Sequence, residues 1–200
     1  MKLYYCPGSC SLCPDIVLRE AGAAFDLVKV NLQEKKLPDG SDYLAVNPKG
    51  QVPALVLDDG EMLTENAAIV QYVADQHPQA DLAPAAGSAA RYRLLEWLSF
   101  IGSELHKTFP ALFIPRYPPE YKPLARQTLE RKFVTLDQHL ANNPYLMGEK
   151  FSVADAYCFS IMIWHKRSDI DLAPWPNLKS YLERIAARPK VREALNAEAA

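Results

Sequence analysis

Short apolar runs alternate with helical patterns over the first eighty residues. The runs at residues 2–5, 25–30 and 52–57 are rich in β-branched and aromatic side chains, which predicts three strands. A turn at Asp58-Asp59-Gly60 predicts a hairpin into a fourth strand at residues 62–63. Apolar side chains at helical spacing follow the first strand, and Thr64 and Glu65 open another helical pattern. This order predicts an α/β domain with a small mixed sheet.

The second half of the chain shows helical patterns and no convincing strand. Apolar side chains at helical spacing predict long helices over residues 91–113 and 120–140. Ser152 and Asp155 form a capping-box pattern that opens a helix to about residue 164, and shorter helices follow Pro176 and Pro189. A stretch rich in proline and alanine separates the halves. We therefore expect an α/β domain over residues 1–80, a linker over 81–87 and an all-α helical bundle over 88–200.

Composition and charge narrow the class of protein. The 200 residues are 49% hydrophobic, which is enough to bury a substantial core. The formal charge of −2 argues against a nucleic-acid partner, which requires a basic surface. No apolar run approaches the roughly 20 residues that span a bilayer, and no terminal segment resembles a secretion signal. We expect a cytoplasmic protein without a membrane partner.

Three of the four cysteines lie close together near the start of the chain, and Cys10 and Cys13 form a C-x-x-C pattern with Cys6 nearby. Structural disulfides are rare in the cytosol. A four-cysteine zinc site would need a second such pair, whereas Cys158 stands alone in an apolar stretch, so no metal is expected. A redox or nucleophilic thiol remains, and the alternative is a set of small buried side chains.

Cys10 stands where the first turn ends and the first helix begins. Unpaired N–H groups and the helix dipole at such a position stabilise a thiolate, so we expect a lowered pKa for Cys10. The alternative is a half-buried cysteine without a role. Cys13 falls in the first turn and points towards the core, so it is at most a resolving partner for Cys10. Cys6, at the end of a strand, is expected to pack.

Two further segments suggest a binding site for an amino acid or peptide. Val52-Pro53 opens a strand with a residue that lacks a backbone N–H, which indicates an edge strand or a backbone surface left open for an extended peptide. Thr64, Glu65 and Asn66 open a helix, where N–H groups suit a carboxylate and Glu65 suits an ammonium group. Ordinary helix capping explains the same residues.

Ser99, Ser103 and His106 recur on one stripe of the predicted helix over residues 91–113. A single histidine in such a helix is usually structural. Three polar residues on one stripe favour the interpretation that this face of the helix lines a cleft.

Five segments, YYCPGSCSL, NPKGQVPAL, LTENAAIVQYVAD, FIGSELHKTF and SVADAY, together resemble the bacterial beta-class glutathione transferases over nearly the full chain. The resemblance implies a thioredoxin-like N-terminal domain and an all-α C-terminal domain, assembled as a homodimer. It also implies an enzyme that conjugates the glutathione thiolate to small hydrophobic electrophiles, with glutathione as co-substrate and no metal.

The resemblance implies a site for each part of glutathione. Val52-Pro53 would be cis, with the valine backbone pairing with the cysteinyl unit, while Lys35 would face the glycine carboxylate. Glu65 and Asn66 would take the γ-glutamyl end, and Cys10 and His106 would lie beside the sulfur as catalytic residues. The implied glutathione-binding set is Cys10, Lys35, Val52, Pro53, Glu65, Asn66, Ser99, Ser103, Glu104, Leu105 and His106, part of it acting across the dimer interface.

The acceptor pocket, expected between the domains, would draw on Phe109, Phe113 and Trp164, which are equally good core residues. Three positions depart from the usual pattern of the class: Asn66 stands where serine is usual, Ser99 stands where asparagine is frequent, and Cys13 stands where a small residue without a thiol is usual. Two alternatives remain open. One is a glutaredoxin-like thiol-disulfide oxidoreductase that uses Cys10 and Cys13. The other is a non-catalytic glutathione-fold binding module, against which the intact Cys10, Glu65 and His106 count.

Overall fold

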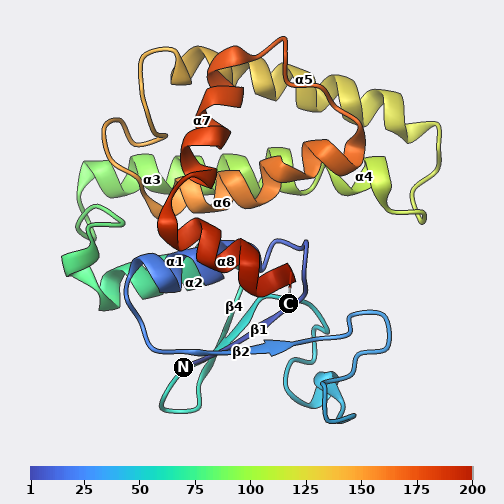
Figure 1. The fold of residues 1–200 in the computed structure, drawn as a ribbon, viewed down its shortest axis with the longest axis vertical. Coiled ribbons are helices and arrows are strands. Elements are labelled where there is room, and N and C mark those ends of the chain that lie inside the picture. The colour runs from blue at the N-terminus through green and yellow to red at the C-terminus, as the bar shows by residue number, and fades with distance from the viewer. Residues whose placement is uncertain (200) are drawn as a thin grey trace. The chain divides into compact units, whose positions relative to one another are not determined.

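The computed structural model describes residues 1–199 and forms two compact units (Figure 1). The first unit comprises residues 1–83 and the chain from Pro189 onward, and the second comprises residues 84–188. The first unit contains β1 (Lys2–Tyr5), α1 (Leu12–Glu20), β2 (Asp26–Lys29), η1 (Tyr43–Ala45), β3 (Ala54–Val56), β4 (Met62–Thr64), α2 (Asn66–Gln76), η2 (Pro78–Ala80) and α8 (Pro189–Ala199).

The sheet of the first unit has the strand order β2-β1-β3-β4. β1 runs parallel to β2, with Leu3 opposite Leu27, and α1 makes the crossover that a parallel pair needs. β3 is antiparallel to both of its neighbours, and the predicted hairpin joins it to β4. The four predicted strands are confirmed. Because β3 is an interior strand and Pro53 lies just before it, the interpretation of Pro53 as a marker of an edge strand is wrong.

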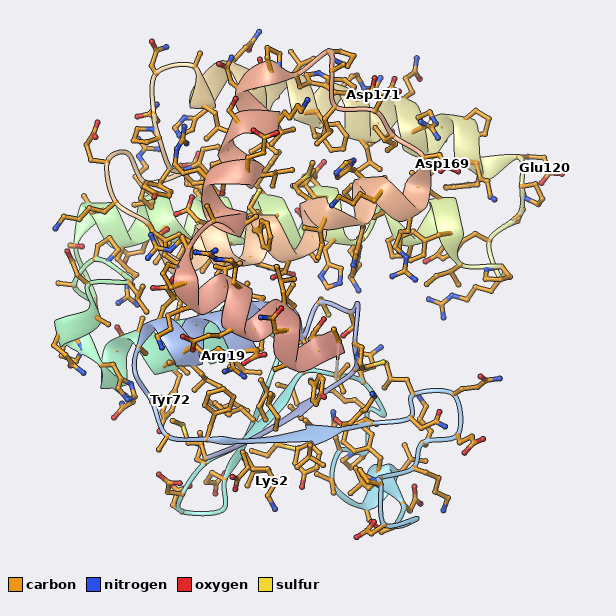
Figure 2. All side chains as sticks on the ribbon, viewed as in Figure 1. Lys2, Arg19, Tyr72, Glu120, Asp169 and Asp171 are labelled. Carbon is orange, nitrogen blue, oxygen red and sulfur yellow. The ribbon has the colours of Figure 1, made fainter. Side chains whose placement is uncertain are left out.

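The last helix of the chain completes the first unit. α8 packs on α1 and buries Val191 and Ala194 there, so residues that we had grouped with the helical domain lie beside the first helix (Figure 1). At the far end of α8, the Gly8 N–H donates to the Glu198 carboxylate at 3.0 Å. On α1 itself, the Nε–H of Arg19, a residue labelled in Figure 2, donates to the Asp15 carboxylate at 2.7 Å.

The second unit is helical throughout, as expected. Its elements are α3 (Ala89–Phe100), η3 (Ile101–His106), α4 (Pro110–Phe113), α5 (Tyr121–Leu140), α6 (Val153–Met162), η4 (Ile163–Ser168) and α7 (Pro176–Ala186). The helix predicted over residues 91–113 is interrupted. α3 passes into the π-helical segment η3, and α4 is a separate turn that starts at Pro110, where no backbone N–H can continue a helix.

The capping box at the start of α6 is confirmed. Asp155 is fully buried, and its carboxylate accepts the Ser152 N–H and hydroxyl at 2.8 Å each, the Leu146 N–H at 2.8 Å and the Tyr181 hydroxyl at 2.9 Å. This network joins α6, α7 and the preceding loop. It fixes the helix that carries Tyr157.

Candidate active site

The Cys10 thiol lies between the start of α1 and the segment before β3. Its S–H donates to the Val52 carbonyl oxygen, with 3.5 Å between the heavy atoms. Burial raises the pKa of Cys10 to about 11, a hydrogen bond from the Asn66 side chain partly lowers it, and the nearby Glu65 charge raises it further. Our prediction of a lowered pKa is wrong, because burial outweighs the favourable helix start. Cys10 is therefore a neutral thiol at pH 7.

Cys13 occupies a different environment from Cys10. Its side chain is fully buried in the first turn of α1, which confirms that it points to the core, and burial raises its pKa well above the usual range. None of the four cysteines forms a disulfide. A resolving thiol must be accessible and must ionise to a thiolate. Cys13 in this conformation is buried and keeps its proton.

The segment before β3 is held by bonds to its backbone carbonyls. The Val52-Pro53 peptide bond is cis, which confirms the expectation drawn from the family resemblance. The Tyr43 hydroxyl and the Asn47 side-chain amide both donate to the Gln51 carbonyl at 2.8 Å. The Lys35 ammonium donates to the Gly50 carbonyl at 2.7 Å, which places it in the same segment.

At the start of α2, the Asn66 side chain hydrogen-bonds to the Cys10 thiol, and the charge of Glu65 lies near that thiol. Glu65 has a positive φ of 70°, a conformation that is strained for a residue with a side chain and that is common at functional sites. Asn66 is buried, and its Oδ1 has no hydrogen-bond partner within the described chain. A buried acceptor without a partner is costly, so this oxygen is ready to receive a donor from a ligand.

Lys49 was missed by the sequence analysis. Its ammonium donates to the Thr64 hydroxyl at 2.8 Å and to the Glu65 carboxylate at 3.2 Å, and both side chains of the ion pair are largely exposed. The signal was its place in the turn Asn47-Pro48-Lys49-Gly50, directly before Val52. The first unit thus gathers Cys10, Lys35, Lys49, Val52, Pro53, Glu65 and Asn66 along one linked set of segments.

The predicted polar stripe of the second unit lies in different environments along its length. Ser99 and Ser103 are exposed, and the Ser103 hydroxyl donates back to the Ser99 carbonyl at 2.9 Å. Glu104 pairs with Lys132 at 2.7 Å, and Leu105 is a fully buried core residue. The prediction of one stripe assumed α-helical spacing through His106. The segment η3 is π-helical and has more residues per turn, so the side chains of Ser103 and His106 do not continue the α-helical stripe.

His106 ends η3 against buried aromatic side chains. Its Nδ1 lies 2.7 Å from the Tyr157 hydroxyl, and its ring centroid lies 5.3 Å from that of Trp164. Trp164 also contacts Phe109 and Phe113 edge to face, at 6.2 and 5.5 Å between centroids. The three residues proposed for the acceptor pocket therefore form one cluster with His106. Tyr157 was missed because no sequence pattern links α6 to η3.

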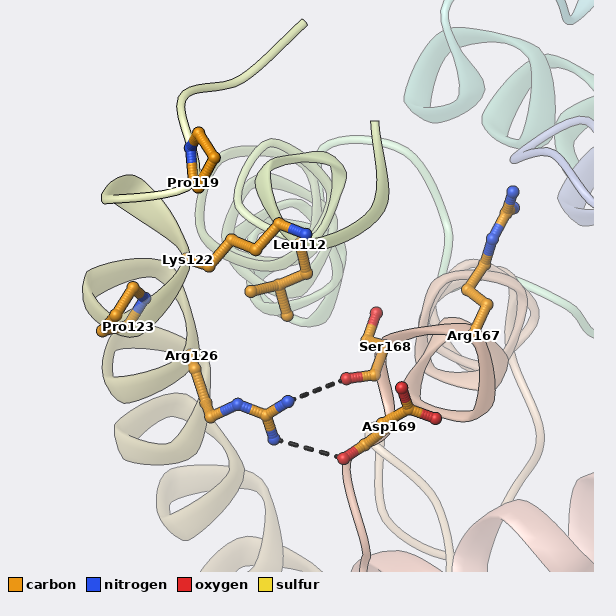
Figure 3. A pocket seen from close by; sticks show the side chains of 8 residues that line it. All are labelled: Leu112, Pro119, Lys122, Pro123, Arg126, Arg167, Ser168 and Asp169. Atoms are coloured by element: carbon orange, nitrogen blue, oxygen red, sulfur yellow. Dashed lines mark hydrogen bonds between the residues drawn. The ribbon is translucent and has the colours of Figure 1, made fainter. Parts of the chain in front are cut away.

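The second unit also contains an open hollow of about 430 Å³ that none of the expected residues lines (Figure 3). It lies between the start of α5 and the end of η4. The Arg126 guanidinium crosses it and donates to the Ser168 and Asp169 carbonyls at 2.9 and 3.3 Å. Arg126 thereby joins α5 to the turn after η4.

Residues 1–199 contain neither a cluster of side chains suited to a metal ion nor a helix suited to cross a membrane. No group of three or more histidine, cysteine, aspartate or glutamate side chains is placed to hold a metal ion. Nor does this part of the chain contain a helix with the length and apolar character needed to cross a membrane.

Comparison with known proteins decides the family. The model for the glutathione S-transferase N-terminal domain matches residues 1–75, and the model for the C-terminal domain matches residues 100–189. The chain belongs to the glutathione transferase family. It is 47% identical over 198 residues to glutathione S-transferase GstA of Escherichia coli O157:H7, covering 99% of this chain and 98% of that protein.

Solved structures identify the class of the transferase within its family. A bacterial beta-class glutathione S-transferase of Sphingomonas chungbukensis matches with a TM-score of 0.95 and 51% identity, over 99% of this chain and 98% of the other. A sphingomonad glutathione S-transferase complexed with glutathione matches with a TM-score of 0.96 and 50% identity, over 100% and 99%. The transferase is a beta-class enzyme with the thioredoxin-like and helical domains expected from its sequence, and glutathione is its co-substrate.

Proposed function

We propose that the transferase conjugates glutathione to small hydrophobic electrophiles, and that the linked segments of the first unit bind glutathione. The observation that carries this proposal is the pair formed by Cys10 and Asn66. A thiol that donates to the Val52 carbonyl stands beside a buried amide oxygen that has no partner among residues 1–199. Val52 offers its backbone to the cysteinyl unit, and Glu65 offers a carboxylate to the glutathione ammonium group.

Cys10 acts as a hydrogen-bond donor in this proposal. With a pKa of about 11 it keeps its proton at neutral pH, so glutathione itself supplies the nucleophilic sulfur. When glutathione is bound, the Cys10 S–H donates to the glutathione thiolate instead of to the Val52 carbonyl, and this bond stabilises the thiolate. A carbon–sulfur bond then forms, the leaving group departs with its electron pair, and the glutathione thiol proton passes to solvent.

Lys35 and Lys49 are the proposed cations for the carboxylates of glutathione. In the second unit, we assign His106 to catalysis and Ser99, Ser103, Glu104 and Leu105 to the glutathione environment. Phe109, Phe113 and Trp164 are assigned to the electrophile. Trp164 contacts both phenylalanines, so these three rings offer one connected apolar surface.

The test is turnover of 1-chloro-2,4-dinitrobenzene with glutathione, compared with turnover of a glutathione mixed disulfide. We expect conjugation by the wild type and by Cys13→Ser, and a lower kcat for Cys10→Ser. If the wild type reduces the mixed disulfide but does not conjugate, and Cys13→Ser stops that reduction, the oxidoreductase alternative replaces this proposal. Failure to bind a glutathione-affinity resin would indicate a non-catalytic module.

We also propose that the transferase is a homodimer whose interface involves the helix that carries Ser99 and Ser103, which is α3 and its continuation η3. Tyr92 on this helix is 64% exposed, and Ser99, two helical turns farther on, is also exposed, so this face has side chains available to a partner chain. Sedimentation at micromolar concentration should show twice the chain mass of 22.4 kDa. A monomer at that concentration would contradict the proposal. The Tyr92→Glu variant should contain more monomer than the wild type at the same concentration.

A further inference from the structure

We propose that Tyr157 is a positioning residue that fixes the neutral His106 ring with its proton on Nε2. His106 then presents an N–H donor to its ligand and is not a general base. This inference rests on the proposed function, because it takes the reacting thiol or its product as that ligand.

The geometry of the pair supports a directed hydrogen bond. The Tyr157 oxygen lies 2.7 Å from His106 Nδ1, a short distance for a contact of this type. The rings meet at 90° with centroids 5.8 Å apart, so the hydroxyl reaches the imidazole edge at its nitrogen. Tyr157 is buried on α6, and the Asp155 network fixes the start of that helix.

The chemistry of the two groups sets the direction of this bond. A phenol is both donor and acceptor, while a neutral imidazole has one N–H and one basic lone pair. The imidazole lone pair is much the stronger base, since protonated imidazole has a pKa near 6.5 and the phenol is an acid with a pKa near 10. The stronger bond therefore has the Tyr157 O–H donating to Nδ1. The ring proton then lies on Nε2.

The other three histidines provide a contrast. His77 and His165 each direct Nδ1 at a backbone carbonyl, those of Val73 and Ile170, at 2.9 Å. A carbonyl can only accept, so these rings carry their proton on Nδ1 when neutral. His139 directs Nε2 at the Leu146 carbonyl at 3.1 Å, which places its proton on Nε2. His106 differs from these three rings because its Nδ1 partner, the Tyr157 hydroxyl, can either donate or accept a proton, so the tautomer of His106 depends on the direction of that bond.

The position of His106 suits an orienting contact. The residue ends η3, and π-helical segments of this kind often occur at functional sites. Trp164 contacts one side of the ring, and the Tyr157 bond fixes its rotation about χ2. A donor fixed in advance loses little freedom when it meets a developing negative charge on sulfur or on the leaving group.

The first experiment reads the tautomer directly. Long-range ¹H–¹⁵N correlation of the imidazoles at pH 8, above the histidine pKa, distinguishes Nδ1–H from Nε2–H rings. Single His→Gln variants assign the four rings. We expect the His106 pattern to match that of His139 and to differ from those of His77 and His165. A His106 pattern that matches His77 and His165 would overturn the proposal, whatever the transferase activity.

The second experiment removes only the hydroxyl. Tyr157→Phe keeps the aromatic ring and should convert the His106 signal into a mixture of tautomers, with a loss of about 5- to 30-fold in kcat and little change in KM for glutathione. Tyr121→Phe, which removes an exposed hydroxyl from α5, is the matched control and should change neither. An unchanged His106 signal in Tyr157→Phe would contradict the positioning role.

The third experiment distinguishes a donor from a base. In His106→Gln the amide –NH₂ can stand near the place of Nε2, whereas in His106→Asn it stands near Nδ1. A donor role predicts that Gln retains several-fold more activity than Asn, and equal loss in both variants counts against it. Wild-type activity in both would overturn the proposed role of His106 itself, a result that the tautomer measurement distinguishes from an error about Tyr157.

Discussion

Removal of the Asp155 carboxylate should destabilise the transferase more than most single substitutions. In Asp155→Ala, four donors lose their acceptor: the Leu146 and Ser152 N–H groups and the hydroxyls of Ser152 and Tyr181. Hydrogen bonds to a charged group contribute about 1.5–3 kcal/mol each. Part of this summed free energy is regained, because the variant no longer has the desolvation penalty of a fully buried carboxylate. The expected net loss in free energy of unfolding is about 3–5 kcal/mol.

The assay is thermal and guanidinium unfolding of Asp155→Ala beside two comparison variants. For a chain of this size the loss corresponds to a fall in Tm of roughly 6–20 °C. Asp171→Ala is the matched control, because this exposed carboxylate accepts one N–H, that of Ala173 at 3.0 Å, and it should change stability by about 0.5 kcal/mol or less (Figure 2). Asp155→Asn keeps an acceptor and should fall between the two. A loss under about 1 kcal/mol in Asp155→Ala would refute the reasoning.

Three predictions concern the first unit. Because the Cys10 thiolate is the attacking species and the Cys10 pKa is about 11, oxidised glutathione should add one glutathione to Cys10 slowly at pH 7 and faster at pH 9, releasing one reduced glutathione. Mass spectrometry should find the adduct in the wild type and in Cys13→Ser, and full modification of Cys10→Ser would contradict this. Because a hydrogen bond from Asn66 lowers the Cys10 pKa, Asn66→Leu should raise that pKa above about 11. In a Cys6→Ser background, this variant should therefore react more slowly with iodoacetamide at pH 9. Faster alkylation would show that the bond is absent. Glu65→Ala should weaken glutathione binding by about 1.5–3 kcal/mol, or roughly 10- to 150-fold in Kd by calorimetry, and an unchanged Kd would remove Glu65 from the site.

Local patterns predicted most of the secondary structure. Strands and helices of the first unit follow from short apolar runs, from helical spacing and from the Asp58-Asp59-Gly60 turn, all of which act between near neighbours in sequence. The box at Ser152 and Asp155 was equally visible, because both partners lie within one helical turn. Features that depend on a few consecutive residues were therefore accessible without a structure.

Properties that depend on distant segments were not accessible in the same way. The pKa of Cys10 was misjudged because its helix start is local, whereas its burial and its contacts with Val52 and Asn66 come from elsewhere in the chain. Tyr157 was missed for the same reason, since only the packing of α6 against η3 brings it to His106. The family resemblance did supply the cis Val52-Pro53 bond, which no local pattern could decide.

The return of the chain to the first unit has a consequence for how the protein is made. During synthesis, β1 to α2 emerge while α8 has yet to be translated, and residues 84–188 take roughly 5–20 s to follow at usual elongation rates. Until then the nascent chain lacks the helix that packs on α1, so that apolar surface stays open on the ribosome. A message truncated before Pro189 would yield a product with the Cys10 segment and both domain cores present but with this surface uncovered. Such a product is a natural client for chaperones and for the proteases that remove incomplete chains.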